Sequence, residues 1–249
     1  ALMALAIVGI ISALTIPTVV KNYQKHAYII GLKKVYSDLQ QNLTILQTDN
    51  YRNRRLSGTI FNLGHIPYYT DEVYLHPAAT IENTTGQFLK TYYKYNQDCG
   101  KNTQPCFADN YGKIKGGEEK FTCSDGYSIL TPSGAAICMI PIKTEEKPTS
   151  SICRPDSPSK YCKLETVKQD HVIVYVDTNG AEGANIGGRD MFTFNIYDDF
   201  SIDVVQPEEI KNATAETSRN TLFDQNCFSS SKGIGCFGKI LNDNWKMNY

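Results

Sequence analysis

The stretch that decides the fold is the N-terminal run ALMALAIVGIISALTIPTVVKNYQK, residues 1–25. From Ala1 to Val20 it has no charged residue, and the first charges are Lys21 and Lys25. A helix needs about 20 apolar residues to cross a hydrocarbon core of about 30 Å. A cleaved secretion signal would start with basic residues and end at a small-residue cleavage site. The run therefore favours a membrane-spanning helix over a secretion signal or a buried helix of a soluble domain.

Two helix-weakening residues, Gly9 and Pro17, interrupt this run. A proline removes one helix hydrogen bond and crowds the carbonyl four residues earlier, here that of Ala13. A glycine costs a helix about 1 kcal/mol relative to alanine. Ser12 and Thr15 lie between them, and their hydroxyls can bond to the loosened carbonyls. The sequence therefore predicts a helix break, in which the helix can partly open from Gly9 to Pro17.

Beyond Pro17 the helical periodicity continues. The mainly apolar positions of this stretch recur mostly at steps of three and four, which indicates an amphipathic helix. At 1.5 Å per residue, one helix over residues 1–48 would be roughly 70 Å long. We expect residues 1–48 to form a stem and residues 49–249 to form a globular extracellular head. The periodic positions are Val19, Tyr23, His26, Ile30, Leu32, Val35, Tyr36, Leu39, Leu43 and Leu46.

The cysteines indicate an oxidising compartment. There are eight of them, none occurs in the first 98 residues, and no CxxC motif is present. This pattern favours a disulfide framework over a set of reduced thiols in a cytosolic protein. Eight cysteines allow 105 connectivities, and the simplest pairing joins sequence neighbours. Those pairs would be Cys99–Cys106, Cys123–Cys138, Cys153–Cys162 and Cys227–Cys236.

Charge and motifs exclude several classes of function. The 25 basic and 26 acidic residues give a net charge of −1, so no specific nucleic-acid partner is predicted. The sequence contains no G-x-S-x-G, H-E-x-x-H or P-loop motif, which are signatures of common hydrolases and nucleotide-binding enzymes. We therefore predict that the protein is not an enzyme.

The head is predicted to be built on an antiparallel sheet, which makes the fold α+β. A hairpin is expected from Tyr127–Leu130 and Ala136–Met139 across a Pro132–Gly134 turn, because apolar runs flank a Pro/Gly turn. Further strands are expected at His171–Val176, at 191–197 and at 200–205. One face of this sheet would lie on the long helix.

The rest of the head is predicted to be irregular. Residues 51–120 show little periodicity, and we expect one short helix near Gly86–Tyr95. The Pro/Ser-rich segment 145–163 and the polar segment 211–220 are expected to be surface loops, the first of them pinned by Cys153–Cys162.

One loop, DTNGAEGANIGGRD at 177–190, is a candidate metal site. Asp177, Asn179, Asn185 and Asp190 supply oxygen donors, and four glycines let the backbone turn back. Calcium takes six to eight oxygen ligands from such loops. The alternative is a turn rich in Asp and Asn that is held by its own hydrogen bonds. The spacing is not that of an EF-hand, so both interpretations stay open.

The N-terminal segments 1–17 and 22–43 resemble the stem helix of type IV pilins and the related pseudopilins. That family places glycine and proline where Gly9 and Pro17 stand. In the family a basic leader is cut before a phenylalanine, which is followed by threonine, leucine or isoleucine, and glutamate. These residues would immediately precede Ala1, so we expect the sequence to begin a few residues late. Lysines that follow the span would favour a cytoplasmic head, and a removed basic leader resolves this conflict with the cysteines.

A second resemblance lies in the C-terminal half. The stretches 172–202 and 236–249, with a D-x-N-G-x-x-G-x-N loop and an N-W-K-M-N-Y ending, are similar to the heads of a subgroup of bacterial pilin-like proteins. The two resemblances imply a pilus subunit that polymerises with copies of itself as a helical homopolymer. They also imply prepilin peptidase and the pilus assembly machinery as partners. The chain would lie in the bacterial inner membrane and then in the extracellular pilus.

Two other functions stay open. The same stem would suit a minor pilin or a type II secretion pseudopilin. A membrane-anchored periplasmic binding protein or enzyme is the alternative from a different class.

Overall fold

The computed structural model describes residues 2–50, 56, 59, 82–142, 145–148, 164–168, 171–206 and 214–249. Side-chain surroundings are not described for residues 2–12, 14, 18, 82, 83, 145–148 and 164–168. The predicted pair Cys153–Cys162 and most of the predicted loop around it lie outside the described residues.

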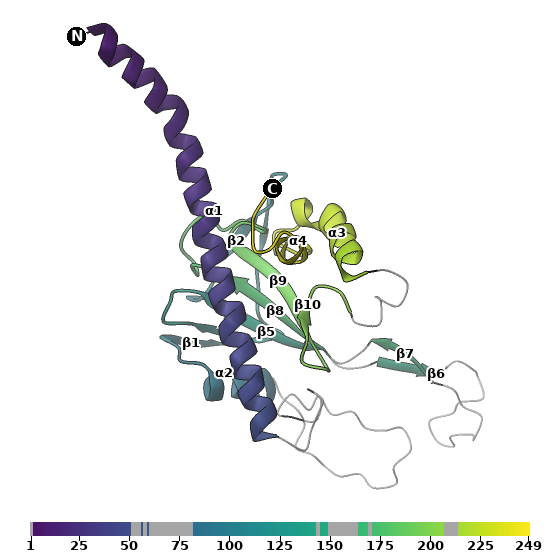
Figure 1. Cartoon of the computed structure of the whole chain (residues 1–249). Helices are drawn as coiled ribbons and strands as arrows, with labels where there is room; N and C mark the ends of the chain where they lie inside the picture. The colour runs from purple at the N-terminus through teal and green to yellow at the C-terminus, as the bar shows by residue number, and fades with distance from the viewer. Residues whose placement is uncertain are drawn as a thin grey trace, which may run out of the picture.

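A single helix, α1 (Leu2–Asp49), forms the N-terminal part of the protein and confirms the predicted long helix. It crosses the head and projects beyond it at its N-terminal end (Figure 1). Pro17 lies within the helix. The helix ends at Asp49, and the main-chain N and side-chain Nδ2 of the next residue, Asn50, both donate to the carbonyl oxygen of Leu46, each at 3.0 Å.

The head contains a six-stranded antiparallel sheet with the order β1-β4-β5-β8-β9-β10. The predicted hairpin and the two following strands are confirmed, and β5 runs further than expected. The bounds are β1 Gln97–Gly100, β4 Tyr127–Leu130, β5 Ala136–Ile142, β8 His171–Asp177, β9 Met191–Tyr197 and β10 Ile202–Asp203.

Two separate hairpins accompany this sheet. One is formed by β2 (Asn110–Gly112) and β3 (Glu118–Lys120), and the other by β6 (Glu145–Pro148) and β7 (Leu164–Lys168). The prediction of a loop was therefore wrong for residues 145–148, because they pair with a strand that lies beyond the Pro/Ser-rich segment. Pro148 closes the pairing at the end of its strand, where a missing N–H is tolerated.

Five short helical segments in the described part of the chain precede or follow the sheet. A π-helical turn at Glu82–Gly86 leads into α2 (Gln87–Tyr92), close to the expected helix. After the sheet come α3 (Ala215–Asn226), a 3₁₀ turn at Cys227–Ser229 and α4 (Cys236–Asn242). The prediction of a polar loop was wrong from residue 215 onward. Thr214 starts α3 because its side chain accepts a hydrogen bond from the Thr217 amide.

The two faces of the sheet serve two apolar cores. Along β5, Ile137 and Met139 point to the core shared with the stem, whereas Ala136 and Cys138 point to a smaller core on the opposite face. This alternation follows from the two-residue period of a strand. The helices α1, α2 and α4 contribute to the first core, and Phe107, Tyr111 and Phe121 fill the second.

Candidate functional site: the stem helix and its seat

The C-terminal half of α1 is seated in the head. A row of side chains at helical spacing is buried against the sheet, and most of the residues between them are polar and exposed. Each fully buried leucine contributes roughly 1.5–3 kcal/mol, so this half of the stem is an integral part of the head's core. The buried row consists of Ile29, Leu32, Val35, Leu39, Leu43 and Leu46.

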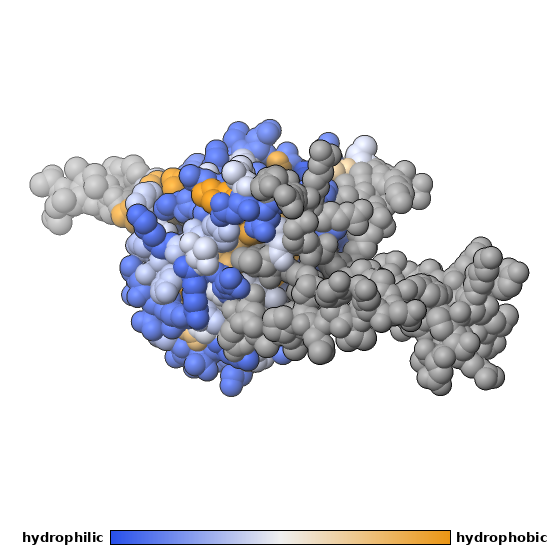
Figure 2. Space-filling model, turned by 90° about the horizontal axis from the view of Figure 1, so that it is seen from below, coloured by the Kyte–Doolittle hydropathy of each residue, from blue (hydrophilic) through white to orange (hydrophobic). Residues whose placement is uncertain are grey.

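The N-terminal half of α1 differs from the C-terminal half because its described apolar side chains are exposed. Val19 is 64 % exposed and Tyr23 is 74 % exposed. Ile16 and Val20 are also exposed, as is Ile30 at the start of the seated half, and the spacing 16, 20, 23 and 30 places these side chains on one side of the helix. Hydrophobic residues are visible on the molecular surface in Figure 2. The stem therefore offers an apolar surface that the described part of the head does not cover.

The C-terminal segment of the chain holds the stem where it enters the head. The ring centroids of Trp245 and Tyr36 are 5.1 Å apart, and Lys33 Nζ lies 5.8 Å from the Trp245 ring. Lys25 Nζ donates to the main-chain oxygen of Tyr249 at 2.6 Å. The two regions that carry the family resemblance are thus in direct contact.

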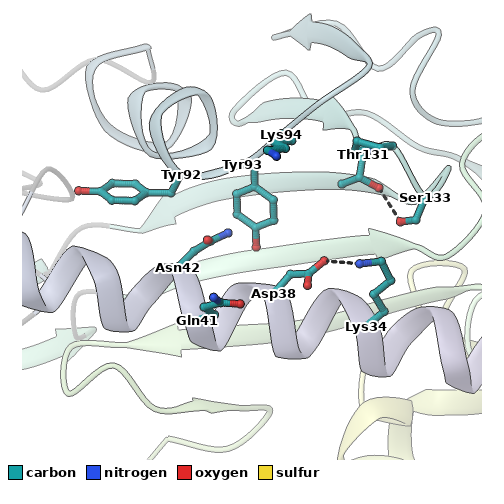
Figure 3. Close-up of a pocket in the computed structure, with 10 residues that line it drawn as sticks. Lys34, Asp38, Gln41, Asn42, Tyr92, Tyr93, Lys94, Thr131 and Ser133 are labelled. Atoms are coloured by element: carbon teal, nitrogen blue, oxygen red, sulfur yellow. Dashed lines mark hydrogen bonds and ion pairs between the residues drawn. The ribbon is translucent and has the colours of Figure 1, made fainter.

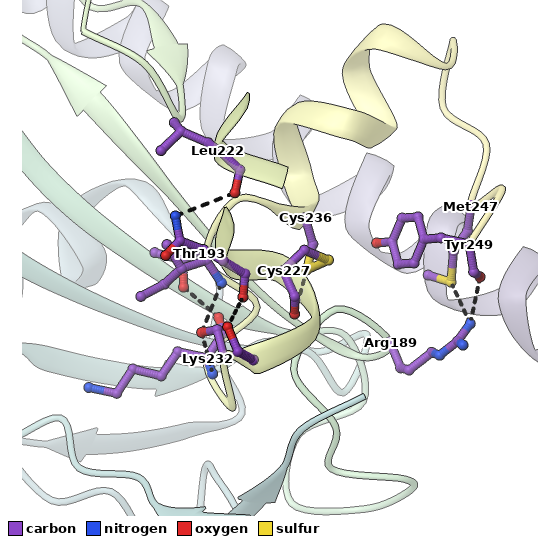
Figure 4. The surroundings of a disulfide bond; sticks show 12 residues. Arg189, Thr193, Leu222, Cys227, Lys232, Cys236, Met247 and Tyr249 are labelled. Carbon is purple, nitrogen blue, oxygen red and sulfur yellow. Dashed lines mark hydrogen bonds between the residues drawn. A yellow bond between two sulfur atoms is a disulfide. The ribbon is translucent and has the colours of Figure 1, made fainter. Parts of the chain in front are cut away.

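Arg189 supports the same segment from the sheet side. Its guanidinium Nη1 donates to the main-chain oxygen of Tyr249 at 3.0 Å (Figure 4). Its positive charge, together with burial, lowers the pKa of Lys25, with burial the larger cause. Two cations therefore converge on one carbonyl at the point where the stem leaves the head.

The predicted loop 177–190 brings its two aspartates into a buried cluster. Asp177 accepts hydrogen bonds from the hydroxyl of Tyr111 and, at 3.0 Å, from the amide of Asn179. Asp190 accepts hydrogen bonds at 2.7 Å from the amides of Asn185 and Ile186. Both carboxyl groups are fully buried. The loop is thus closed by its own side chains and backbone.

Burial determines the charge of this cluster. It raises the pKa of Asp177 to about 8, with the neighbouring charge of Asp190 as the second cause. Burial also raises the pKa of Asp190, although the amide donors of Ile186 and Asn185 oppose the shift. At neutral pH the Asp177 carboxyl is therefore mainly neutral, since its pKa lies above 7.

The two predicted asparagine ligands stabilise the turn. Asn179 donates its side-chain amide to the carbonyl oxygen of Glu182, and Asn185 donates to that of Ala181 at 3.3 Å. Asn185 has a φ of 49°, a left-handed conformation that asparagine tolerates. Within the described ranges, no three or more His, Cys, Asp or Glu residues are grouped so that they could hold a metal ion. The calcium site stays a prediction.

This loop also forms part of the stem's seat. A Cβ atom placed on Gly31 would lie 3.1 Å from the Cβ of Thr178, so the glycine allows α1 to approach the loop closely. Tyr28 lies beside the same loop, where burial raises its pKa first and the charges of Asp190 and Asp177 raise it further. Sequence reasoning missed the role of Tyr111, because it is 66 residues from its partner Asp177 and no local motif connects them.

Three of the four predicted disulfides are present: Cys99–Cys106, Cys123–Cys138 and Cys227–Cys236. The third joins the end of α3 to the start of α4, beside the segment that ends at Tyr249 (Figure 4). It therefore braces the part of the head that contacts the stem.

The proposed helix break falls only partly within the described residues. Pro17 is exposed on the stem, and the side-chain surroundings of the helix at Gly9 lie outside the described residues. In the part of the chain with described side chains, no helix is both long and apolar enough to cross a membrane. The predicted span at residues 1–20 falls largely on residues whose surroundings are not described.

Comparisons with protein-family models, with curated proteins and with solved structures found no match to this chain.

Proposed function

We propose that this protein is a structural subunit of a type IV pilus, assembled through its N-terminal helix. One observation carries the proposal. The same helix is deeply seated in the head over Ile29–Leu46 and exposes Ile16, Val19 and Tyr23 where it projects from it. A stem of this kind anchors the head at one end and offers an apolar surface at the other.

The physical basis is that this apolar surface is unfavourable in water. Burying an exposed Val, Ile or Tyr side chain gains on the order of 1.5–3 kcal/mol. Moving it from lipid into a bundle of identical helices exchanges one apolar medium for another, so the net change is small. Contacts between different surfaces of successive copies do not close on themselves and yield an open fibre. A subunit stored in the inner membrane can thus enter and leave a filament at little cost.

The location and partners belong to the same proposal. The chain waits in the bacterial inner membrane with its head outside, and the disulfides fit an oxidising compartment on that side. Prepilin peptidase removes the leader, and the pilus assembly machinery transfers the subunit into an extracellular filament. No enzymatic activity, cofactor or nucleic-acid partner is part of this role.

Electron microscopy of sheared cell-surface material, with mass spectrometry of the purified filaments, tests the proposal. We expect long filaments in which this chain is the main component. Removal of residues 1–20 is expected to abolish them, whereas the double substitution Gly9→Ala and Pro17→Ala is expected to leave membrane insertion intact and alter fibre assembly or extensibility. Native-looking filaments from the truncated chain would refute the role of the stem.

The same experiment separates the alternatives. Filaments that contain only traces of the chain would indicate a minor pilin, and a short periplasmic rod would indicate a pseudopilin. A monomer in detergent that binds or turns over a ligand would indicate a membrane-anchored binding protein or enzyme.

A further inference from the structure

A groove lined by polar and aromatic side chains lies between the stem and the head. It has a volume of about 260 Å³ and is formed by α1, the end of α2 and the turn between β4 and β5 (Figure 3). Drug-sized ligands generally occupy larger cavities, so a groove of this size suits one small molecule. Its lining residues are Lys34, Asp38, Gln41, Asn42, Tyr92, Tyr93, Lys94, Thr131, Pro132 and Ser133.

The groove contains an unpaired buried hydroxyl. Tyr93 is only 8 % exposed, and its Oη has no hydrogen-bond partner among the described residues. The amide of Asn42 acts to lower the pKa of this phenol, but the two groups do not reach hydrogen-bonding geometry. Burial is the larger effect and raises the pKa of Tyr93 far above its ordinary value. The hydroxyl is therefore a neutral donor, and leaving it unpaired is unfavourable.

Two further groups have free acceptor capacity. Asp38 uses Oδ2 to accept from Lys34 at 3.1 Å, and no described residue donates to its Oδ1. Thr131 donates its only hydroxyl proton to the carbonyl of Ala135 at 2.9 Å. In the 3.0 Å contact between Thr131 and Ser133, the proton therefore comes from Ser133, whose oxygen keeps its lone pairs.

The charge in the groove is largely balanced. Lys34 is paired with Asp38, and Lys94 is exposed, where water screens its charge. The aromatic ring of Tyr93 adds an apolar face to these polar groups, whereas Tyr92 points away from them and donates its hydroxyl to Asp49 at 2.8 Å (Figure 3). The groove thus combines a buried donor, several acceptors, two amides and a ring face without a strong net charge.

We propose that this groove binds one pyranose ring of a neutral sugar. A pyranose presents hydroxyls that both donate and accept, and its C–H faces pack on aromatic rings. One sugar hydroxyl would accept from Tyr93 Oη, and others would donate to Asp38 Oδ1 and Ser133 Oγ. The amides of Gln41 and Asn42 can serve as donors or acceptors. The site lies within one chain, so it does not depend on the proposed filament.

Saturation-transfer NMR on the full chain in detergent tests this site. The probes are the methyl pyranosides of glucose, galactose, mannose and N-acetylglucosamine, each titrated into the millimolar range. We expect saturation transfer to at least one glycoside. Tyr93→Phe, which removes only the unpaired hydroxyl, is expected to weaken that binding at least tenfold, and Asp38→Asn is expected to weaken it several-fold. Tyr95→Phe is the matched control, since Tyr95 lies two residues away, is exposed and does not line the groove.

Three outcomes would overturn the proposal. The first is no transfer to any glycoside with the wild-type chain, which would leave water as the partner of Tyr93. The second is equal affinity in the wild type and in Tyr93→Phe. The third is equal weakening by Tyr95→Phe. Circular dichroism of each variant establishes that it is folded. Asp38→Asn provides an independent readout, because the Asp38 side chain is 44 % exposed and its replacement is not expected to disturb the core.

Discussion

The two halves of α1 have the same secondary structure and opposite surroundings. Leu39 in the seated half is fully buried, whereas Val19 in the projecting half is 64 % exposed. The seated half has one apolar face, and its partner is encoded in the same chain. The projecting half exposes apolar side chains that no described residue covers. Helix formation alone therefore does not determine what a helix packs against. The distribution of apolar residues around the helix determines its partner.

The largest expected effect comes from truncating one residue in each half. Leu39→Ala should lower the free energy of unfolding by about 2–5 kcal/mol, because it leaves a cavity in a packed core. Val19→Ala should change it by less than about 0.5 kcal/mol, because its site is exposed. Chemical denaturation of the full chain in detergent measures both. Comparable losses for the two variants would contradict the division of the helix into two halves.

The next largest loss of stability is expected when the disulfide Cys227–Cys236 is removed from the part of the head that contacts the stem. Replacing Cys227 and Cys236 by serine removes a cross-link over a sequence separation of 9. The expected loss is about 2–4 kcal/mol, since the unfolded chain gains freedom. Thermal melting is the measurement, and filament formation at permissive temperature should persist. A variant that melts normally but no longer assembles would place this disulfide in a contact between subunits.

A smaller effect, the pH dependence of stability, tests the loop 177–190, which contacts the stem. The pKa of Asp177 is about 8 in the folded protein and about 3.8 in the unfolded chain. The folded state then binds an extra proton between these values, so stability should fall as pH rises from about 4 to about 8. We expect a loss on the order of 2 kcal/mol over pH 6–8, measured by denaturation at several pH values.

Asp177→Asn should remove most of this pH dependence, because asparagine resembles the neutral acid. Asp125→Asn is the control, since Asp125 lies on the exposed surface. An unchanged pH slope in Asp177→Asn would mean that Asp177 is ionised in the folded protein. Bound calcium would also favour the ionised form, so the same titration with added calcium or EDTA examines the predicted metal site.

The smallest effect is expected at Gly31, where the stem touches the loop. Gly31→Ala gains up to about 1 kcal/mol of helix propensity. It also places a methyl group 3.1 Å from the Cβ of Thr178, which has to move by a few tenths of an ångström. The two effects oppose each other, so the melting temperature should change little. A large loss would show that the loop cannot yield and that the stem's position is fixed there.

The sequence predicted those elements whose pattern is local. The stem, the β4–β5 hairpin and the strands β8 and β9 each have clear periodicity or a recognisable turn, and all of them are confirmed. The helix α3 was missed because its sequence AETSRNTLFDQN is polar and buries only Phe223. The strand β1 was missed because QDCG lacks alternation and is defined by its pairing with β4, about 30 residues later.

The candidate site was predictable to a similar extent. Asp177 and Asp190 were identified from the loop itself, and they are brought together. Their partner Tyr111 comes from another hairpin, and the Arg189–Tyr249 contact spans 60 residues. Neither follows from local spacing, because both depend on how the sheet and the C-terminal segment are placed on the stem.

The seating of α1 also has a mechanical consequence. Its buried row from Ile29 to Leu46 extends over about 25 Å at 1.5 Å per residue. A pull along the helix axis at the N-terminal end would have to slide all six side chains past the sheet at once. Such shear divides the tension among six contacts, whereas peeling would break them one after another. The geometry therefore makes the connection between stem and head strongest in the direction in which a fibre would be stretched.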